Sequence, residues 1–407
     1  MSSVENNTLP QGWRLMSLKD KEVCELIMGQ SPSSDTYNIE GKGLPFFQGK
    51  KEFGKVSPIA EKYCTEPMKI ASPGDILMSV RAPVGPTNIA NVVCCIGRGL
   101  AAVRPNLNFT LKNYLLYYFK NFEVEFSKKG KGSTFSAITK SALEESIIPI
   151  PPLKEQKRIV AKIDTLFTKI DKAISLTEES LKQAKNLLPS VLKEVFEKGK
   201  ADGWEEKEFG EVITILTDYH ANGSYKVLKK NVELKDIEDY AWMIRSTDFE
   251  KKFKNSLKYI DKHAYDFMSK SQVYGNEIIM SKIGNAGIVY LMPSIDRPVS
   301  LAMNLFLIRL NENIVLPDFI FRFLKSNDGE TQIKKRLKGA TTKTITKDNV
   351  RNIIISYPNL KEQKKIVKKL NNLSEKAKQT QFKLEEQLGY LKQLKSSILS
   401  KAFKGEL

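Results

Sequence analysis

Two long segments of the chain carry apolar or small residues at alternating intervals of three and four. In the first segment these positions are Ile159, Ile163, Leu166, Ile170, Ala173, Leu181, Ala184, Leu188, Val191 and Val195. In the second they are Ile366, Leu370, Leu373, Ala377, Leu384, Leu388, Leu391, Ile398 and Ala402. This spacing is typical of the narrow seam of a coiled coil. The pattern predicts two long helices, each about 60 Å in length at about 1.5 Å per residue.

Prolines indicate where these helices begin. Proline disfavours helix at its own position and at the residue before it, so helix is excluded just upstream of each segment, at Pro149, Pro151, Pro152 and Pro358. Pro189 falls inside the first helix, where we expect a kink. Two successive steps of four through Thr177 indicate a stutter, which locally unwinds a coiled coil.

An internal repeat covers most of the chain. Residues 150–160, IPPLKEQKRIV, match residues 357–367, YPNLKEQKKIV, at an offset of 207. The same offset aligns further segments: 132–134 with 339–341, 138–140 with 345–347, and 190–192 with 397–399. Upstream the match is looser, with DILMS at 75–79 resembling EIIMS at 277–281. Each copy is therefore a variable domain followed by a well-matched helix.

The repeat predicts four parts of the chain. They are two variable domains and two matched helical segments, at residues 1–149, 150–200, 201–356 and 357–407. Short apolar runs predict strands at 76–80 and 278–281 and short helices at 114–119 and 319–324. Neither helical seam can bury itself alone, so we expect the two to pair. The predicted fold is two mixed α/β globular domains, related by a pseudo-twofold axis and separated by a long antiparallel two-helix coiled coil. The alternative is that each helix packs on its own domain or on another subunit.

The charge balance favours an anionic partner. The 407 residues include 65 Lys and Arg against 47 Asp and Glu, a formal net charge of +18, and nucleic acid is the commonest partner of so basic a chain. No run of 18 apolar residues and no signal peptide is evident, so we expect no membrane span and a cytoplasmic location. The four cysteines form no CxxC pair and there are two histidines, His220 and His263, so no structural metal site is expected.

Motifs for catalysis are not recognisable. Glu155-Gln156-Lys157 and Glu362-Gln363-Lys364 have the E-x-K form of a nuclease, but no acidic cluster lies near them in the sequence. The glycine spacing at 43–50 does not fit a phosphate loop. No GxGxxG motif opens a nucleotide-binding fold, and neither histidine recurs in the other copy. We therefore expect no catalytic residue and no cofactor in this chain.

Basic and polar loops remain as candidates for DNA binding. Both copies carry a loop of lysines and hydroxyl residues in the same place, which suits contacts to phosphates. The candidates there are Lys128, Lys129, Lys131, Ser133 and Thr134 in the first copy, and Lys338, Thr341, Thr342 and Lys343 in the second. Base edges are read mainly by arginine, asparagine, glutamine and lysine. Candidates for base contacts, in the loops after the matched strands, are Arg81, Asn88, Arg98, Lys282, Asn285 and Arg297.

These motifs together resemble one family. Two variable domains, each followed by G-S/A-T, I-T-K, P-x-L-K-E-Q-K-x-I-V and a long helix, resemble the specificity subunit of type I restriction-modification systems. The final residues 397–407, SILSKAFKGEL, are echoed at 190–199. Asn359 departs from the pattern, because the first copy has Pro152 there.

The resemblance implies a role for each part. Each variable domain would be a target-recognition domain for one half of an asymmetric bipartite site in double-stranded DNA, and the paired helices would set the spacer. Methyltransferase subunits, expected to number two, would dock beside the helices and use S-adenosylmethionine. Motor-nuclease restriction subunits would use ATP and magnesium. Two other classes stay open: a self-contained DNA nuclease and a coiled-coil scaffold that binds only protein.

Overall fold

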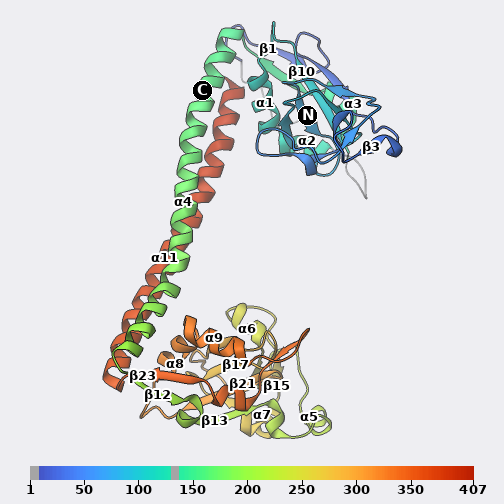
Figure 1. Ribbon diagram of the computed structural model, residues 1–407. Helices are drawn as coiled ribbons and strands as arrows, with labels where there is room; N and C mark the ends of the chain where they lie inside the picture. Colours follow the sequence, from blue (N-terminus) through green and yellow to red (C-terminus); the bar gives the residue numbers. More distant parts are fainter. Residues whose placement is uncertain (1–8, 130–136) are drawn as a thin grey trace. The chain divides into compact units, whose positions relative to one another are not determined.

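The chain divides into two compact units. The computed structural model describes residues 9–129 and 137–407 (Figure 1). The first unit is Met1–Glu178 with Glu385–Leu407, and the second is Glu179–Leu384. The division falls inside both long helices, α4 (Leu153–Ala201) and α11 (Leu360–Lys404). Each unit therefore contains one variable domain and one stretch of each long helix.

The first unit contains two main sheets. The strand order is β2-β10-β7-β8 in the first sheet and β3-β5-β4-β9-β6 in the second, where β4 and β9 run parallel. A further pair, β1 with β11, brings the start of the domain beside the residues just before α4. The strands are β1 (Arg14–Ser17), β2 (Cys24–Met28), β3 (Tyr37–Asn38), β4 (Leu44–Phe47), β5 (Tyr63–Cys64), β6 (Ile70–Ala71), β7 (Ile76–Ser79), β8 (Thr87–Ile89), β9 (Cys94–Ile96), β10 (Leu100–Pro105) and β11 (Ile147–Ile150).

The second unit repeats this topology, except that its second main sheet has four strands instead of five. Its main sheets have the orders β13-β21-β17-β19 and β15-β14-β20-β16, with β14 and β20 parallel, and β12 pairs with β23 as β1 does with β11. One more pair, β18 with β22, joins two loops. The strands are β12 (Glu205–Glu208), β13 (Ile213–Asp218), β14 (Ala241–Ile244), β15 (Tyr259–Ile260), β16 (Gln272–Val273), β17 (Ile278–Ser281), β18 (Ile283–Gly284), β19 (Val289–Leu291), β20 (Val299–Leu301), β21 (Leu305–Leu310), β22 (Lys343–Thr344) and β23 (Ile354–Tyr357).

Short helices complete both units. The first has α1 (Lys112–Asn121), α2 (Glu123–Lys129) and α3 (Lys140–Glu144), and the second has α5 (Tyr225–Asn231), α6 (Ser246–Glu250), α7 (Lys262–Phe267), α8 (Pro317–Leu324), α9 (Asn327–Arg336) and α10 (Lys347–Arg351). Short 3-10 helices lie at Ser34–Thr36, Lys50–Glu52, Phe209–Val212, Tyr219–Asn222 and Ser269–Ser271. The strands predicted at 76–80 and 278–281 and the helices predicted at 114–119 and 319–324 are confirmed by β7, β17, α1 and α8.

The central strands of each unit are buried on both faces. Along β7, Ile76 and Met78 join a core shared with α1 and the long helices, whereas Leu77 faces a smaller core shared with the second sheet. In β17, Ile278 and Met280 face α8, and Ile279 faces the other way. Side chains of a strand alternate between its faces. A strand covered on both faces is therefore apolar throughout, which explains the two continuous apolar runs.

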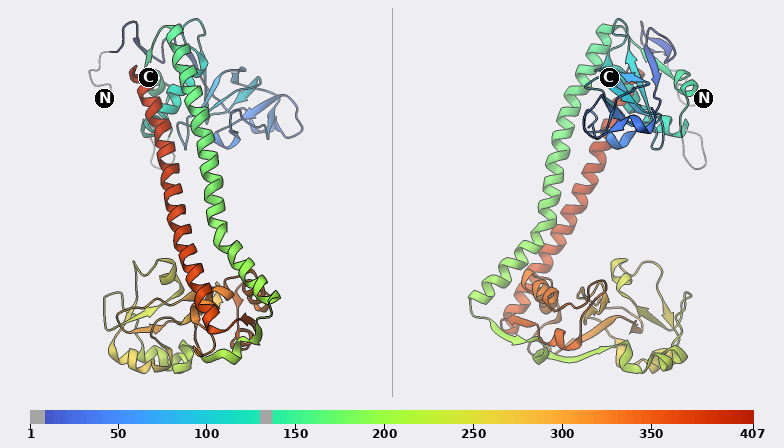
Figure 2. Two further views of the ribbon diagram at one scale, coloured as in Figure 1. Left: turned by 90° about the vertical axis from the view of Figure 1, so that its left-hand side faces the viewer. Right: turned by 45° about the vertical axis from the view of Figure 1, so that its right-hand side comes forward.

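The long helices pack against each other in both units (Figure 2). In the first unit, Ile163 of α4 shares a core with Ile398 of α11, and Lys395 Nζ lies 2.7 Å from Asp171 Oδ1. In the second unit, the side-chain amide of Gln381 donates to the carbonyl of Ala184 at 3.1 Å. From the first of these contacts to the last, the α4 residue moves forward in the chain, from Asp171 to Ala184, whereas the α11 residue moves back, from Lys395 to Gln381. The two helices therefore run antiparallel. The paired helices predicted from the apolar seam are confirmed, and α4 remains helical through Pro189.

A buried glutamine holds the start of each long helix. Gln156 Oε1 accepts from the Leu111 N–H at 2.8 Å, and its Nε2 donates to the carbonyls of Phe109 and Pro151 at 2.7 and 2.9 Å. Gln363 makes the equivalent three bonds, to Leu316, Ile314 and Pro358, at 2.8, 3.0 and 2.8 Å. Both side chains are fully buried. The glutamine of the repeated E-Q-K motif therefore has a structural role.

Replacing Gln156 with alanine should destabilise the first unit. The substitution leaves one buried N–H and two carbonyls without their partner, which we expect to lower the free energy of unfolding by about 1–3 kcal/mol. Urea unfolding followed by circular dichroism measures the change. The neighbouring Lys157→Ala is the matched control, because Lys157 is exposed. Equal stability of the two variants would contradict a structural role for the glutamine.

Candidate nucleic-acid interface

Four loops of the first unit meet at one end of its strands. They are residues 29–31, 47–49, 80–86 and 97–99, which we call the first loop cluster. Backbone hydrogen bonds join them: Gln30 N–H to the Ile96 carbonyl at 3.0 Å, Gly97 N–H to Phe47 at 2.8 Å, and Val80 N–H to Gly99 at 2.9 Å. The Ile138 N–H also donates to the Val80 carbonyl at 2.9 Å, so the chain that follows the basic loop runs beside the cluster.

The second unit builds an equivalent group of loops, at residues 282–288, 302–304 and 338–345, which we call the second loop cluster. Lys282 N–H donates to the Asn304 carbonyl at 2.7 Å, and Ile345 N–H donates to Lys282 at 3.1 Å. The strand pair β18–β22 joins the loop after β17 to the basic loop. The structure therefore brings the two kinds of candidate loop together, although they are far apart in the sequence.

Glycines allow the first loop cluster to close. A Cβ atom added to Gly29 would lie 2.1 Å from the Gly97 carbonyl oxygen, and one added to Gly99 would lie 2.1 Å from that of Gln48. Both distances are far below van der Waals contact. The backbone segments can approach this closely only where these side chains are absent.

The predicted residues of the first unit lie in different environments. Arg81 and Arg98 are exposed in the first loop cluster. Asn88 is buried in β8, where its Nδ2 donates to the Gly54 carbonyl at 2.8 Å. Lys128 is exposed near the end of α2, which also includes Lys129. Three further candidates lie outside the described residues: Lys131, Ser133 and Thr134.

In the second unit most candidates meet. Five of the predicted residues are exposed in the second loop cluster: Asn285, Lys338, Thr341, Thr342 and Lys343. Arg297 lies before β20, at the other end of that strand from Asn304. It donates to Glu238 Oε1 at 2.7 Å, and its guanidinium stacks 5.1 Å from the Trp242 ring centroid. The structure therefore does not bring Arg297 into the cluster.

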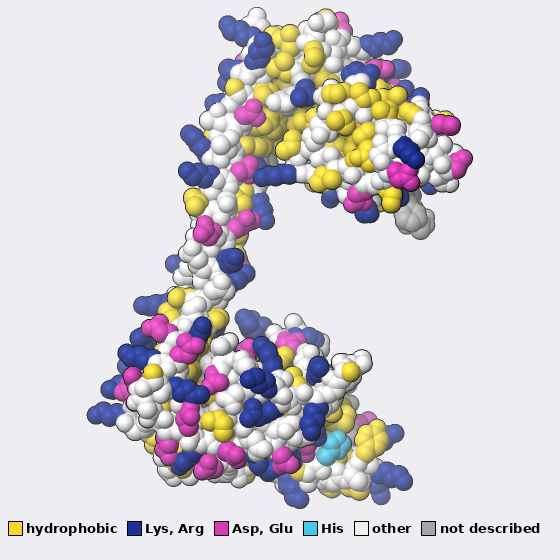
Figure 3. Space-filling model, viewed as in Figure 1, with side chains coloured by type: hydrophobic (Ala, Val, Ile, Leu, Met, Phe, Trp, Pro, Cys, Tyr) yellow, Lys and Arg dark blue, Asp and Glu magenta, His cyan; other side chains and the backbone are white. Residues whose placement is uncertain are grey.

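Lys282 is held by an internal ion pair. Its Nζ lies 2.8 Å from Asp218 Oδ2, and Lys347 lies 3.7 Å from the same carboxylate. Burial acts to raise the pKa of Asp218, but the hydrogen bond from Lys282 and the charge of Lys347 outweigh it and leave the pKa below its ordinary value. The lysine ammonium is therefore committed to a carboxylate that stays ionised. Other Lys and Arg side chains spread over the face of this unit that carries α9 (Figure 3).

Two exposed glutamines of the first loop cluster were missed by the sequence analysis. Gln30 follows β2 and Gln48 follows β4, and neither side chain makes a hydrogen bond within the described part of the chain. Each stands next to a glycine at the end of a strand. That combination was the available signal, but it occurs at many turns, and only the fold shows that both turns meet.

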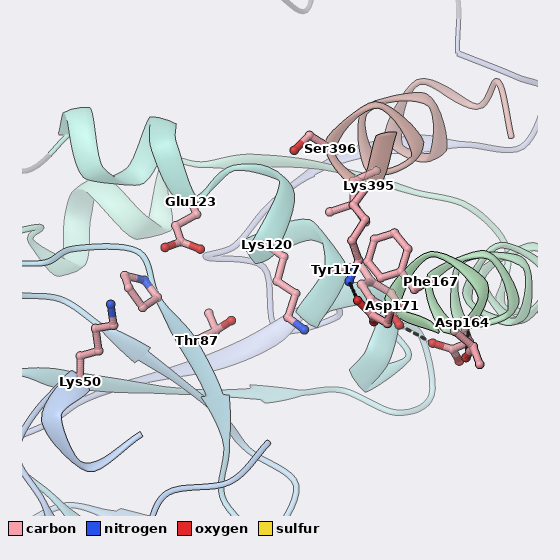
Figure 4. Close-up of a pocket in the computed structure, with 13 residues that line it drawn as sticks. Lys50, Thr87, Tyr117, Lys120, Glu123, Asp164, Phe167, Asp171, Lys395 and Ser396 are labelled. Atoms are coloured by element: carbon pink, nitrogen blue, oxygen red, sulfur yellow. Dashed lines mark hydrogen bonds and ion pairs between the residues drawn. The ribbon is translucent and has the colours of Figure 1, made fainter. Parts of the chain in front are cut away.

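A groove lies beside the long helices in the first unit (Figure 4). Its volume is about 720 Å³, and it is lined by α1, α2, α4, α11, the start of β8 and the 3-10 helix at Lys50–Glu52. Lys395 lies across the Phe167 ring, with Nζ 4.4 Å from the centroid, and Tyr117 donates a hydrogen bond to Asp164. Burial lowers the pKa of Lys120, and the nearby charge of Lys395 acts in the same direction.

The second unit has a groove at the equivalent place. Its volume is about 800 Å³. Seven of its lining positions follow the first groove at the repeat offset of 207: Leu188, Pro189 and Leu192 correspond to Lys395, Ser396 and Leu399, and Asn371, Ser374, Glu375 and Lys378 correspond to Asp164, Phe167, Thr168 and Asp171. The groove is thus a repeated feature whose side chains differ between the copies.

Neither groove has the donor set of a metal centre. Within residues 9–129 and 137–407, no group of three or more His, Cys, Asp and Glu side chains is placed to hold a metal ion. Among the helices described, none is both long enough and apolar enough to cross a membrane.

Known proteins resemble this chain over different lengths. The chain is 42% identical over 187 residues to a protein of Methanocaldococcus jannaschii named as the specificity subunit of a proposed type I restriction enzyme, MjaX. That match covers 45% of this chain and 44% of the relative, so it spans less than half of the relative's length. The StySPI type I restriction enzyme specificity subunit of Salmonella potsdam is 23% identical, over 98% of this chain and 90% of that one.

A solved structure is also similar. The HsdS subunit from Thermoanaerobacter tengcongensis is 52% identical over 41% of this chain and 40% of that chain, with a TM-score of 0.38. The profile of a family described as the type I restriction modification DNA specificity domain matches twice, at residues 10–184 and 201–389. The two matches cover both copies of the repeat. The chain therefore belongs to the type I restriction modification DNA specificity domain family.

Proposed function

We propose that this chain is the DNA-recognition subunit of a type I restriction-modification complex. Each variable domain reads one half of a bipartite, asymmetric site, and the paired helices set the spacer between the halves. The observation that carries this proposal is the pair of loop clusters. The same backbone scaffold occurs twice, with hydrogen bonds at equivalent positions, but its exposed side chains differ. A fixed frame with variable loops suits the reading of two different sequences.

The chemistry of the complex belongs to its other subunits. Methyltransferase subunits use S-adenosylmethionine, and motor-nuclease subunits use ATP and magnesium. This chain supplies recognition and docking. The two grooves support docking of two methyltransferase subunits, one in each, because equivalent positions line both grooves.

Removal of the gene should abolish one methylated motif in host DNA. We expect a bipartite motif to disappear from the methylation map, since no other subunit selects the sequence, and to return when the gene is restored. Single-molecule sequencing of host DNA measures this. DNA cleavage by the purified chain alone would instead favour a self-contained nuclease. An unchanged methylation map would favour a protein-only scaffold.

Shortening both helices by one heptad should shorten the spacer. The deletion removes 172–178 from α4 and 388–394 from α11, which lie opposite each other beside the Asp171–Lys395 pair. Seven residues at about 1.5 Å each remove about 10 Å, or about three base pairs at about 3.4 Å each. Methylation mapping should show the same half-sites at the new distance. An unchanged spacer, with both half-sites intact, would show that the helices do not measure it.

An arginine placed in either groove should reduce the number of bound methyltransferase subunits from two to one. Thr168→Arg fills the first groove and Glu375→Arg the second; both positions are exposed and equivalent in the repeat. Native mass spectrometry of the co-expressed complex gives the stoichiometry. Lys19→Ala, at an exposed position outside the residues that line the grooves, is the control and should retain two subunits. Two bound subunits in both arginine variants would contradict docking in the grooves.

A further inference from the structure

We propose that the first unit reads its half-site through four side chains of the first loop cluster: Gln30, Gln48, Arg81 and Arg98. Arg81 and Arg98 contact guanines and the two glutamines contact adenines, in the major groove of duplex DNA. This inference rests on the proposed function, because it names the residues and the bases of the same recognition event.

The other arginines of the first unit already form ion pairs within the protein. In the described part of the first unit, Arg14 pairs with Glu22 at 2.7 Å, Arg104 with Asp75 at 2.8 Å, and Arg158 with Glu155 at 2.7 Å. Arg81 and Arg98 are exposed and form no side-chain hydrogen bond or ion pair with any residue that the structure describes. The two free guanidinium groups of this unit therefore lie in the same group of loops.

The second unit contrasts with the first. Five of its arginines form ion pairs: Arg245, Arg297, Arg309, Arg322 and Arg351. Arg336 donates instead to the carbonyls of Gln332 and Asn352, at 3.0 and 2.5 Å. No described arginine of that unit is free, so we infer that the second half-site is read without arginine contacts to bases.

The four side chains carry the hydrogen-bonding groups that guanine and adenine require. Arginine presents two donors that match the O6 and N7 acceptors of guanine, and glutamine presents one donor and one acceptor that match N7 and N6 of adenine. Both patterns are accessible in the major groove. The four residues stand on four loops, so each can address a different base.

The loops that carry these side chains are held in place before DNA binds. Gln30 N–H donates to Ile96, and Arg98 N–H donates to Ser31 Oγ at 3.2 Å. Gly99 lies directly against Gln48. A recognition surface whose backbone is fixed loses less conformational entropy on binding than a flexible one. The side chains can still rotate, but the backbone positions that carry them are fixed.

Selection from a random pool of DNA duplexes tests the assignment. The full-length purified chain is incubated with duplexes that contain a randomised segment, and the bound fraction is sequenced. We expect the wild-type chain to select a site whose first half contains guanine and adenine at contacted positions. Arg81→Ala and Arg98→Ala should each lose preference for guanine at one position, by about ten- to a hundredfold, and Gln30→Ala and Gln48→Ala should lose preference for adenine. The second half-site should not change.

Two further variants sharpen the test. Arg98→Gln should convert one guanine preference into adenine, a gain that loss of folding cannot produce. Lys19→Ala, an exposed change outside the cluster, should leave every base preference unchanged. If the wild-type chain selects a bipartite site and all four alanine variants select the same one, the assignment is wrong while the proposed function stands. If the wild-type chain selects no sequence at all, both are wrong.

Discussion

A buried glutamine amide ties each variable domain to its long helix. Water does not reach Gln156 or Gln363, so the hydrogen bonds of each amide must be made within the protein. Each amide bonds the chain just before a short helix, α1 or α8, and a proline carbonyl just before the long helix. The short and long helices are therefore fixed to each other at their starts. Because these helices form walls of the grooves, the shape of each groove depends on this contact.

Because the central strands are buried, their side chains pack in the cores and the side chains left for binding lie in the loops. Strands β7 and β10, like β17 and β21, are covered on both faces, so almost all their side chains are committed to packing. Side chains for binding must then come from the loops at the ends of the strands. Glycines at Gly29 and Gly99 bring these loops together by close backbone contact. The order of the first main sheet is equivalent in both units, whereas the exposed loop side chains differ.

Much of the fold was predictable from local pattern, and most of the site was not. The seam of α4 and α11 and the runs in β7 and β17 are set by nearby residues, so the sequence reveals them. The second sheet of each unit consists mainly of strands of two to four residues, whose pairing depends on distant segments. Tertiary contacts also decide which of the predicted base-contact side chains are free of partners within the protein. Asn88 donates to the Gly54 carbonyl and Arg297 donates to Glu238, and neither partner is adjacent in sequence.

Buried carboxylates decide which basic side chains are free to make contacts outside the protein. Asp75 and Asp248 have side chains only 4% and 1% exposed, so removal of their arginine partners would leave a buried charge unpaired, which is costly. The same principle distinguishes the two loop clusters. In the strand ladder Asp218 opposes Phe306, as Met28 opposes Ala101 at the equivalent place in the first unit. The acidic residue holds Lys282 in an ion pair. The first unit has Met28 and Val80 at these positions, so neither position supplies a carboxylate that could pair with the nearby arginines.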